Sequence, residues 1–89
     1  MKNRELIEKE LQGTGFKIGG FSDDMERLNI ANLKKVIDNM TYSSTDIDVR
    51  INRKAYVVEV NHVDDEIDFG VITKAEYISR YGNERYEED

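Results

Sequence analysis

The chain has 89 residues, of which 38% are hydrophobic and 36% are charged, and this length suits one small domain rather than two. The 19 acidic side chains against 13 basic ones give a formal net charge of −6, which argues against a protein that coats nucleic acid. The absence of cysteine excludes a disulfide framework, a thiolate zinc site and a cysteine nucleophile, and a single histidine excludes a clustered imidazole metal site.

The net negative charge is concentrated in the last third of the chain. Residues 1–60 carry ten bases and ten acids, whereas residues 61–89 carry three bases and nine acids. Such asymmetry is typical of an acidic surface or an acidic tail. The N-terminal segment has no apolar run long enough for a signal peptide or a membrane span, so we expect a cytoplasmic protein without a membrane partner.

The first residues predict one short helix. Over residues 3–11, apolar side chains lie on one helical face and charged side chains cover the rest. Gly13 and Gly15 end this helix, because glycine tolerates the left-handed conformation that helix ends need. Residues 16–18 then form a brief extended piece before two further glycines.

A second helix is predicted from Asp23 to Met40. Ser22 and Asp23 are good N-cap residues, and apolar side chains then recur at helical spacing as far as Met40. Asn29 and Asn32 are weak helix formers, so the pattern also allows a break near them.

The second half of the chain changes to the alternation of apolar and polar residues that is typical of half-buried strands. Residues 46–51 and 56–61 form two strands joined by a turn at 52–55, and a third strand follows a turn at 64–65. We expect these side chains to face inward: Ile47, Val49, Ile51, Tyr56, Val58, Val60, Ile67, Phe69 and Val71.

A last helix is predicted between Thr73, which caps it, and Gly82, which ends it. Helices must cover the apolar face of the sheet. We therefore expect an α+β fold with two layers, in which a three-stranded antiparallel β-meander packs against two N-terminal helices and one C-terminal helix. Residues 1–89 form a single domain, with residues 83–89 as a frayed acidic tail.

Carboxylates face one another on the outer side of this predicted sheet. In one register Asp48 lies opposite Glu59, and in a slipped register Asp46 takes that position. The third strand places Asp68 on the other side of Glu59, and it places Glu66 beside Asn61 in the next row. Facing like charges cost stability, within the ~0.2–1 kcal/mol typical of a cross-strand pair.

The functional interpretation is that this acidic surface binds a basic partner. Side chains two residues apart on a strand stand roughly 6.6 Å apart, so two rows of carboxylates imitate a run of nucleic-acid phosphates. The candidate partner-binding residues are Asp46, Asp48, Glu59, Asp64, Asp65, Glu66 and Asp68. The alternative is a structural or accessory module that homodimerises or docks through an apolar surface, with an acidic face that serves only solubility.

The layout resembles that of small phage-encoded inhibitors, among them some anti-CRISPR proteins. The resemblance lies in size, acidity, the lack of cysteine and the helix–meander–helix order, with the acidic meander at 46–71 followed by a helix that opens at 73–77. It implies a non-enzymatic inhibitor or regulator whose carboxylates occupy the basic cleft of a nucleic-acid-handling protein such as a nuclease.

No motif in the sequence predicts an enzyme, a metal site or a cofactor. The glycine-rich segment 13–20 fits neither a Walker A loop nor a dinucleotide fingerprint, and residues 64–68 lack the spacing of a calcium loop. His62 is placed at a strand end or in the turn, without a catalytic role. The bases Arg27, Lys34, Lys35, Arg50, Arg53 and Lys54 are interpreted as parts of solvated faces. We therefore expect a protein partner with a basic surface and no direct nucleic-acid partner.

Overall fold

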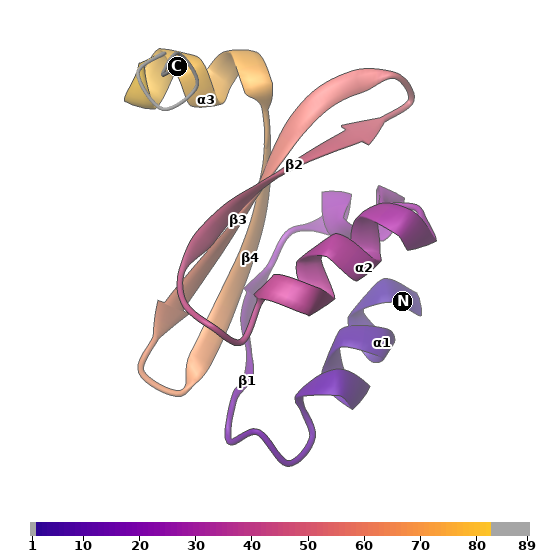
Figure 1. Ribbon diagram of the computed structural model, residues 1–89, viewed down its shortest axis with the longest axis vertical. Helices are drawn as coiled ribbons and strands as arrows, with labels where there is room; N and C mark the ends of the chain where they lie inside the picture. The colour runs from indigo at the N-terminus through magenta and orange to yellow at the C-terminus, as the bar shows by residue number, and fades with distance from the viewer. Residues whose placement is uncertain (1, 83–89) are drawn as a thin grey trace.

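The computed structural model describes residues 2–82, which form a mixed sheet of four strands together with three α-helices and one 3₁₀ helix (Figure 1). In chain order the elements are α1 (Lys2–Leu11), β1 (Lys17–Phe21), the 3₁₀ helix η1 (Asp23–Arg27), α2 (Ile30–Asn39), β2 (Thr45–Ile51), β3 (Lys54–Val63), β4 (Glu66–Thr73) and α3 (Lys74–Tyr81). The strands lie in the order β1-β4-β3-β2. The predicted α+β class is confirmed, whereas the acidic tail expected over 83–89 lies outside the described residues.

One face of the sheet packs against α1, η1 and α2 and holds the main hydrophobic core. The inward side chains predicted for β2 and β3 all lie on this face, and they are Ile47, Val49, Ile51, Tyr56, Val58 and Val60. Tyr56 is half-buried at the edge of the core, and the other five are buried. The alternation in the sequence therefore predicted correctly which face of the hairpin meets the helices.

The hairpin between β2 and β3 turns through only two residues, Asn52 and Arg53. Both have a positive φ, 52° and 68°, as a tight turn that matches the twist of the strands requires. This turn fixes the register in which Asp46 lies opposite Glu59. The first of the two predicted registers, with Asp48 opposite Glu59, is wrong, and so is the four-residue turn at 52–55 that it requires.

The hairpin between β3 and β4 is equally tight, with residues 64–65 as its turn. The strands pair so that Glu59 lies opposite Gly70, and Asp68 lies opposite Asn61. The predicted row of three facing carboxylates is therefore wrong. The glycine opposite Glu59 has no side chain, so the carboxylate has room on that side.

A fourth strand, β1, pairs in parallel with β4, where the sequence predicts only a short extended piece. The pairing is irregular between Ile18 and Phe21, and in this irregularity the Gly20 N–H donates a hydrogen bond of 2.7 Å to the Asp68 carboxylate. A Cβ at Gly19 would overlap with the same carboxylate. Glycine at this position therefore lets the strand lie close to the Asp68 side chain.

The second predicted helix is divided into η1 and α2. The backbone is extended at Leu28, and Asn29 caps α2 by accepting a hydrogen bond of 2.9 Å from the Asn32 N–H. The break that the two asparagines allow is thus confirmed. The Asn32 amide also donates to the Arg50 carbonyl oxygen at 2.9 Å, which ties the start of α2 to the edge strand β2.

The last helix, α3, lies on the other side of the sheet from α1 and α2 (Figure 1). Val57, on the outer face of β3, is completely buried, and so is Tyr77 of α3, yet neither belongs to the main core. A second, smaller apolar contact therefore holds α3 in place. The predicted two-layer arrangement with every helix on one face is wrong at this end, where the sheet lies between helices.

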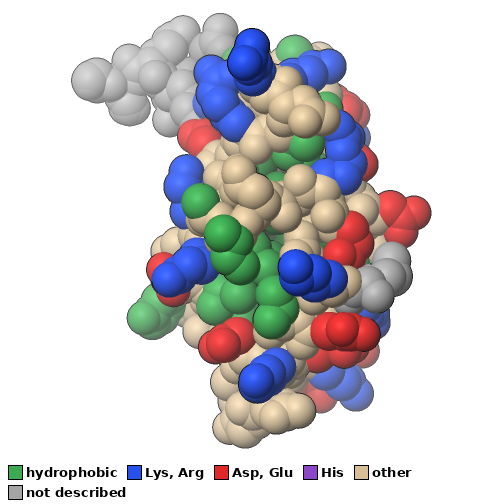
Figure 2. Space-filling model, turned by 90° about the vertical axis from the view of Figure 1, so that its right-hand side faces the viewer, with side chains coloured by type: hydrophobic (Ala, Val, Ile, Leu, Met, Phe, Trp, Pro, Cys, Tyr) green, Lys and Arg blue, Asp and Glu red, His purple; other side chains and the backbone are tan. Residues whose placement is uncertain are grey.

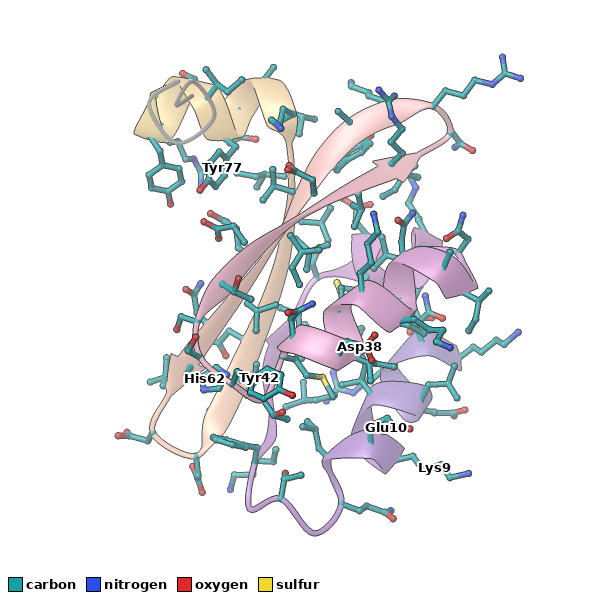
Figure 3. All side chains as sticks on the ribbon, in the orientation of Figure 1. Lys9, Glu10, Asp38, Tyr42, His62 and Tyr77 are labelled. Atoms are coloured by element: carbon teal, nitrogen blue, oxygen red, sulfur yellow. The ribbon has the colours of Figure 1, made fainter. Side chains whose placement is uncertain are left out.

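His62 joins β3 to the end of α2. Its Nε2 donates a hydrogen bond of 2.6 Å to the Met40 carbonyl oxygen, and its ring packs edge-on against Phe16 with 5.1 Å between ring centroids. Figure 3 labels His62 near the end of β3. The histidine lies at the strand end, as predicted, and it connects secondary-structure elements.

The side chain of Glu26 closes the N-terminus of α1. Its two oxygens accept hydrogen bonds from the N–H groups of Asn3 (2.8 Å) and Arg4 (3.0 Å), which a helix leaves without internal partners. The Asn3 amide in turn donates to the carbonyl oxygens of Met25 and Leu28. Partial burial raises the pKa of Glu26, but the two backbone donors and a nearby positive charge together lower it by more, so this pKa lies below its ordinary value.

Replacing this cap should destabilise the domain in a pH-dependent way. Glu26→Gln removes the charge that favours a helix N-terminus, so we expect the free energy of unfolding at pH 7 to fall by about 1 kcal/mol. A carboxylate whose pKa is lowered by folding stabilises the folded protein at pH values above its unfolded-state pKa of about 4.3. This stabilisation is lost as the pH falls through the folded-state pKa. Urea denaturation of both proteins between neutral and acidic pH measures the difference.

The matched control is Glu10→Gln, which neutralises an exposed carboxylate at the other end of the same helix. Its effect should stay within about 0.5 kcal/mol. Equal effects of the two substitutions, or a difference that persists at low pH, would contradict the capping role of Glu26.

Candidate functional site

A hollow of about 580 Å³ lies between α3 and the outer face of the sheet. Its lining consists of Ser44, Thr45, Asp46, Glu59, Asn61, Tyr77 and Tyr81. The two carboxylates are the pair that the β2–β3 register places opposite each other. Among residues 2–82, no lysine or arginine lines the hollow, so its described walls are polar and acidic.

Two tyrosine hydroxyls of α3 bind the two carboxylates. The Tyr77 hydroxyl donates to Asp46 Oδ2 at 2.5 Å, and the Tyr81 hydroxyl donates to Glu59 Oε2 at 3.2 Å. Residues four apart in a helix lie on one face, so both rings reach the same row of the sheet, with 4.7 Å between their centroids. Figure 3 shows Tyr77 extending from α3 toward the sheet. These hydroxyl dipoles offset part of the repulsion between the facing carboxylates.

Asp48 lies one row away, opposite Val57 rather than Glu59. Its carboxylate accepts a hydrogen bond of 3.0 Å from Lys74 Nζ at the start of α3, and 58% of the aspartate side chain is exposed. Exposed ion pairs contribute little to stability. Asp48, which was predicted to lie at one end of the acidic row, is therefore paired with a cation where α3 begins.

Glu66 and Asp68 lie together beside β1, both half-buried. Glu66 pairs with Val63 across the β3–β4 hairpin, and not with Asn61 as predicted. Because Asp68 accepts the Gly20 N–H, it has a structural role in joining β1 to β4. These two carboxylates are on the outer face, but neither of them lines the hollow.

Asp64 and Asp65 form the exposed tip of the β3–β4 hairpin. The Asp65 carbonyl oxygen accepts a hydrogen bond of 3.0 Å from the Lys17 N–H, which holds the tip against the start of β1. Within residues 2–82, no hydrogen bond or ion pair engages the two carboxylates themselves. They are thus available to a partner without any change in the fold.

The seven predicted residues therefore fall into separate groups on one face of the sheet. Asp46 and Glu59 meet in the hollow, whereas Asp48, the Glu66–Asp68 pair and the hairpin tip lie apart from them. Sequence reasoning did not predict that Tyr77 and Tyr81 complete the hollow. The signal was present in their spacing of four residues, but the sequence alone does not say which face of the sheet α3 covers.

No group of three or more His, Asp and Glu side chains within residues 2–82 is arranged to hold a metal ion. None of the helices in this range is long and apolar enough to cross a membrane. Comparison of the chain with protein-family models, with curated proteins and with solved structures gave no match.

Loss of the buried tyrosine hydroxyl should weaken the attachment of α3. Tyr77→Phe leaves the ring in place but removes the donor to Asp46, so we expect the free energy of unfolding to fall by about 2 kcal/mol, as for hydrogen bonds to charged groups. Tyr81 is 47% exposed, and its hydroxyl can be replaced by water, so Tyr81→Phe should cost only about 0.5 kcal/mol. Chemical denaturation of both variants measures the contrast.

Equal losses in the two phenylalanine variants would contradict this account of the hollow. So would a Tyr77→Phe variant as stable as the parent protein, because the Asp46 carboxylate would then not depend on this donor.

Proposed function

We propose that this protein is a non-enzymatic binding protein whose acidic outer face occupies a basic cleft of a partner protein. A partner that handles nucleic acid, such as a nuclease, suits this face because its cleft normally holds phosphates. The protein then acts as an inhibitor or regulator by nucleic-acid mimicry in the cytoplasm, as the resemblance to small phage-encoded inhibitors implies.

The observation that carries this proposal is that carboxylates from three strands, although in separate groups, share one face of the sheet. The pairing of β2, β3 and β4 puts Asp46, Asp48, Glu59, Glu66 and Asp68 on the outer face. The hairpin tip at 64–65 extends this acidic surface beyond the end of β3. A face of this kind attracts a basic cleft over a distance and speeds association at low salt.

A second candidate function has its own supporting observation. Ile30 and Tyr42, at the two ends of α2, are 65% and 82% exposed, and hydrophobic side chains gather on the side of the molecule where α1 and α2 lie (Figure 2). Exposed apolar surface of this kind supports homodimerisation or docking in a larger assembly. The acidic face would then serve only solubility.

Charge reversal at the hairpin tip separates the two functions. The variant Asp64→Lys/Asp65→Lys changes two exposed side chains that form no hydrogen bond or ion pair with another described residue. The matched control, Glu10→Lys/Asp38→Lys, changes the net charge equally on the exposed sides of α1 and α2. Each protein is immobilised, and proteins captured from lysate at about 0.05 M and about 0.5 M salt are compared and then purified.

The proposal predicts that the captured protein binds nucleic acid and dissociates from the immobilised wild type at high salt. Both the wild type and the control should displace it from its DNA or RNA. The hairpin-tip variant should bind it at least tenfold more weakly, since two reversed charges repel a basic cleft. A purified partner that binds all three proteins equally, with no competition from nucleic acid, would overturn the proposal and favour docking through the apolar side.

A further inference from the structure

Basic side chains gather at the end of the molecule opposite the acidic hairpin tip. The basic end, as we call it, combines the tip of the β2–β3 hairpin with η1, the middle of α2 and the start of α3. Its residues are Arg27, Lys35, Arg50, Arg53, Lys54 and Lys74. In Figure 2 the lysine and arginine side chains crowd the upper part of the molecule. These residues come from five separate elements and one turn, so only the fold brings them together.

A hollow of about 450 Å³ lies within the basic end. Lys35 of α2, Arg50 of β2 and Lys74 of α3 all line it, together with Tyr56. Asp48 is the only acidic residue among its described lining. Three cations and one anion therefore share a space large enough for a small polyanionic group.

The fold holds several of these cations in place. Arg27 and Lys54 lie over the Tyr56 ring, 5.8 Å and 5.9 Å from its centroid. The Arg50 guanidinium donates one hydrogen bond of 2.7 Å, to the Arg53 carbonyl oxygen, and a guanidinium has five N–H donors. Arg50 is thus oriented while donors are left for a ligand.

The positive charge of the basic end exceeds the nearby negative charge. Arg27 has Asp24 as an ion-pair partner at 3.4 Å, and Lys74 has Asp48 at 3.0 Å. Within residues 2–82, no carboxylate forms an ion pair with the remaining four bases, which are Lys35, Arg50, Arg53 and Lys54. Crowded like charges repel one another, and an anionic ligand relieves this repulsion.

We propose that the basic end binds phosphate groups of a nucleotide or of a nucleic-acid strand. Guanidinium and ammonium groups from different elements suit a phosphate, which offers several oxygens to donors arriving from different directions. This inference is independent of the proposed function, because the acidic hairpin tip belongs to the opposite end of the sheet. It also differs from the expectation that nucleic acid is not a direct partner, which rested on net charge alone.

The test measures the fluorescence anisotropy of a labelled single strand of about 20 nucleotides and of a duplex of similar length, at about 0.05 M and 0.2 M salt. Lys35→Gln/Arg50→Gln should weaken binding about tenfold or more and reduce the salt dependence by about one to two released ions. The matched control Lys9→Gln/Lys17→Gln removes the same charge from α1 and β1 and should change binding less than about twofold. Urea denaturation of both variants checks that they are folded.

Inorganic phosphate and a nucleoside triphosphate are titrated as competitors. If the nucleotide displaces the strand at a concentration similar to that of the strand itself, the site is assigned to a small nucleotide. If only longer strands displace it, the site is assigned to a nucleic-acid backbone. The absence of binding to every phosphate probe at low salt would overturn the proposal. An equal loss of binding in the control would also overturn it. So would a protein that self-associates in a salt-sensitive way, loses this self-association in Lys35→Gln/Arg50→Gln and binds no phosphate probe.

Discussion

The two-residue turns of the β-hairpins are the constraint on which the outer face of the sheet depends. A two-residue turn leaves no freedom in pairing, so Ile51 must pair with Lys54, and Val63 must pair with Glu66. Every later row follows from these two pairs. They place Asp46 beside Glu59, and they leave Gly70 rather than a third carboxylate on the far side.

The packing of α3 turns this register into a site. Val57 offers a buried apolar contact on the outer face, and Tyr77 packs on that side of the sheet with its hydroxyl on Asp46. Two like charges that would repel in water thus become acceptors for two tyrosine donors. The cost of facing carboxylates, of the order of 0.2–1 kcal/mol, is smaller than the gain from a hydrogen bond to a charged group, about 1.5–3 kcal/mol.

The same register separates charge along the sheet. Arg50 and Lys74 belong to the end where β2 meets β3, whereas residues 64–68 bring carboxylates to the end where β3 meets β4. The net charge of −6 is therefore the sum over regions of opposite sign, among them a positive end and a negative face. The two proposals therefore concern different parts of the molecule, the acidic face for a basic partner and the basic end for phosphate groups.

The sequence predicted the local features well and the long-range ones poorly. Alternation over 46–51 and 56–61 identified the inward side chains, because a period of two leaves only one apolar face. It did not distinguish two registers that share that face, since both keep the same residues inside. The strand β1 escaped prediction because Gly19 and Gly20 carry no apolar signal, and its pairing depends on β4, far along the chain.

The candidate site shows the same division between local features, which the sequence predicts, and long-range contacts, which it does not. All seven predicted carboxylates are on the outer face or its hairpin tip, but their grouping depends on turn geometry, on the position of β1 and on the face that α3 covers. The tyrosines of α3 and the basic end are contacts between distant segments. The spacing of the two tyrosines places them on one face of α3, but no pattern within a single element shows what that face or the basic residues meet.

Nuclear magnetic resonance measures the central claim directly. Because Ile51 and Lys54 are a hydrogen-bonded pair, the alternate pairs Asp46–Glu59 and Asp48–Val57 are not hydrogen-bonded, and their Cα atoms approach to about 4.5 Å. The account predicts strong Hα–Hα nuclear Overhauser contacts within these two pairs. A strong Hα–Hα contact between Asp48 and Glu59 instead would contradict the register, and with it the hollow beneath α3.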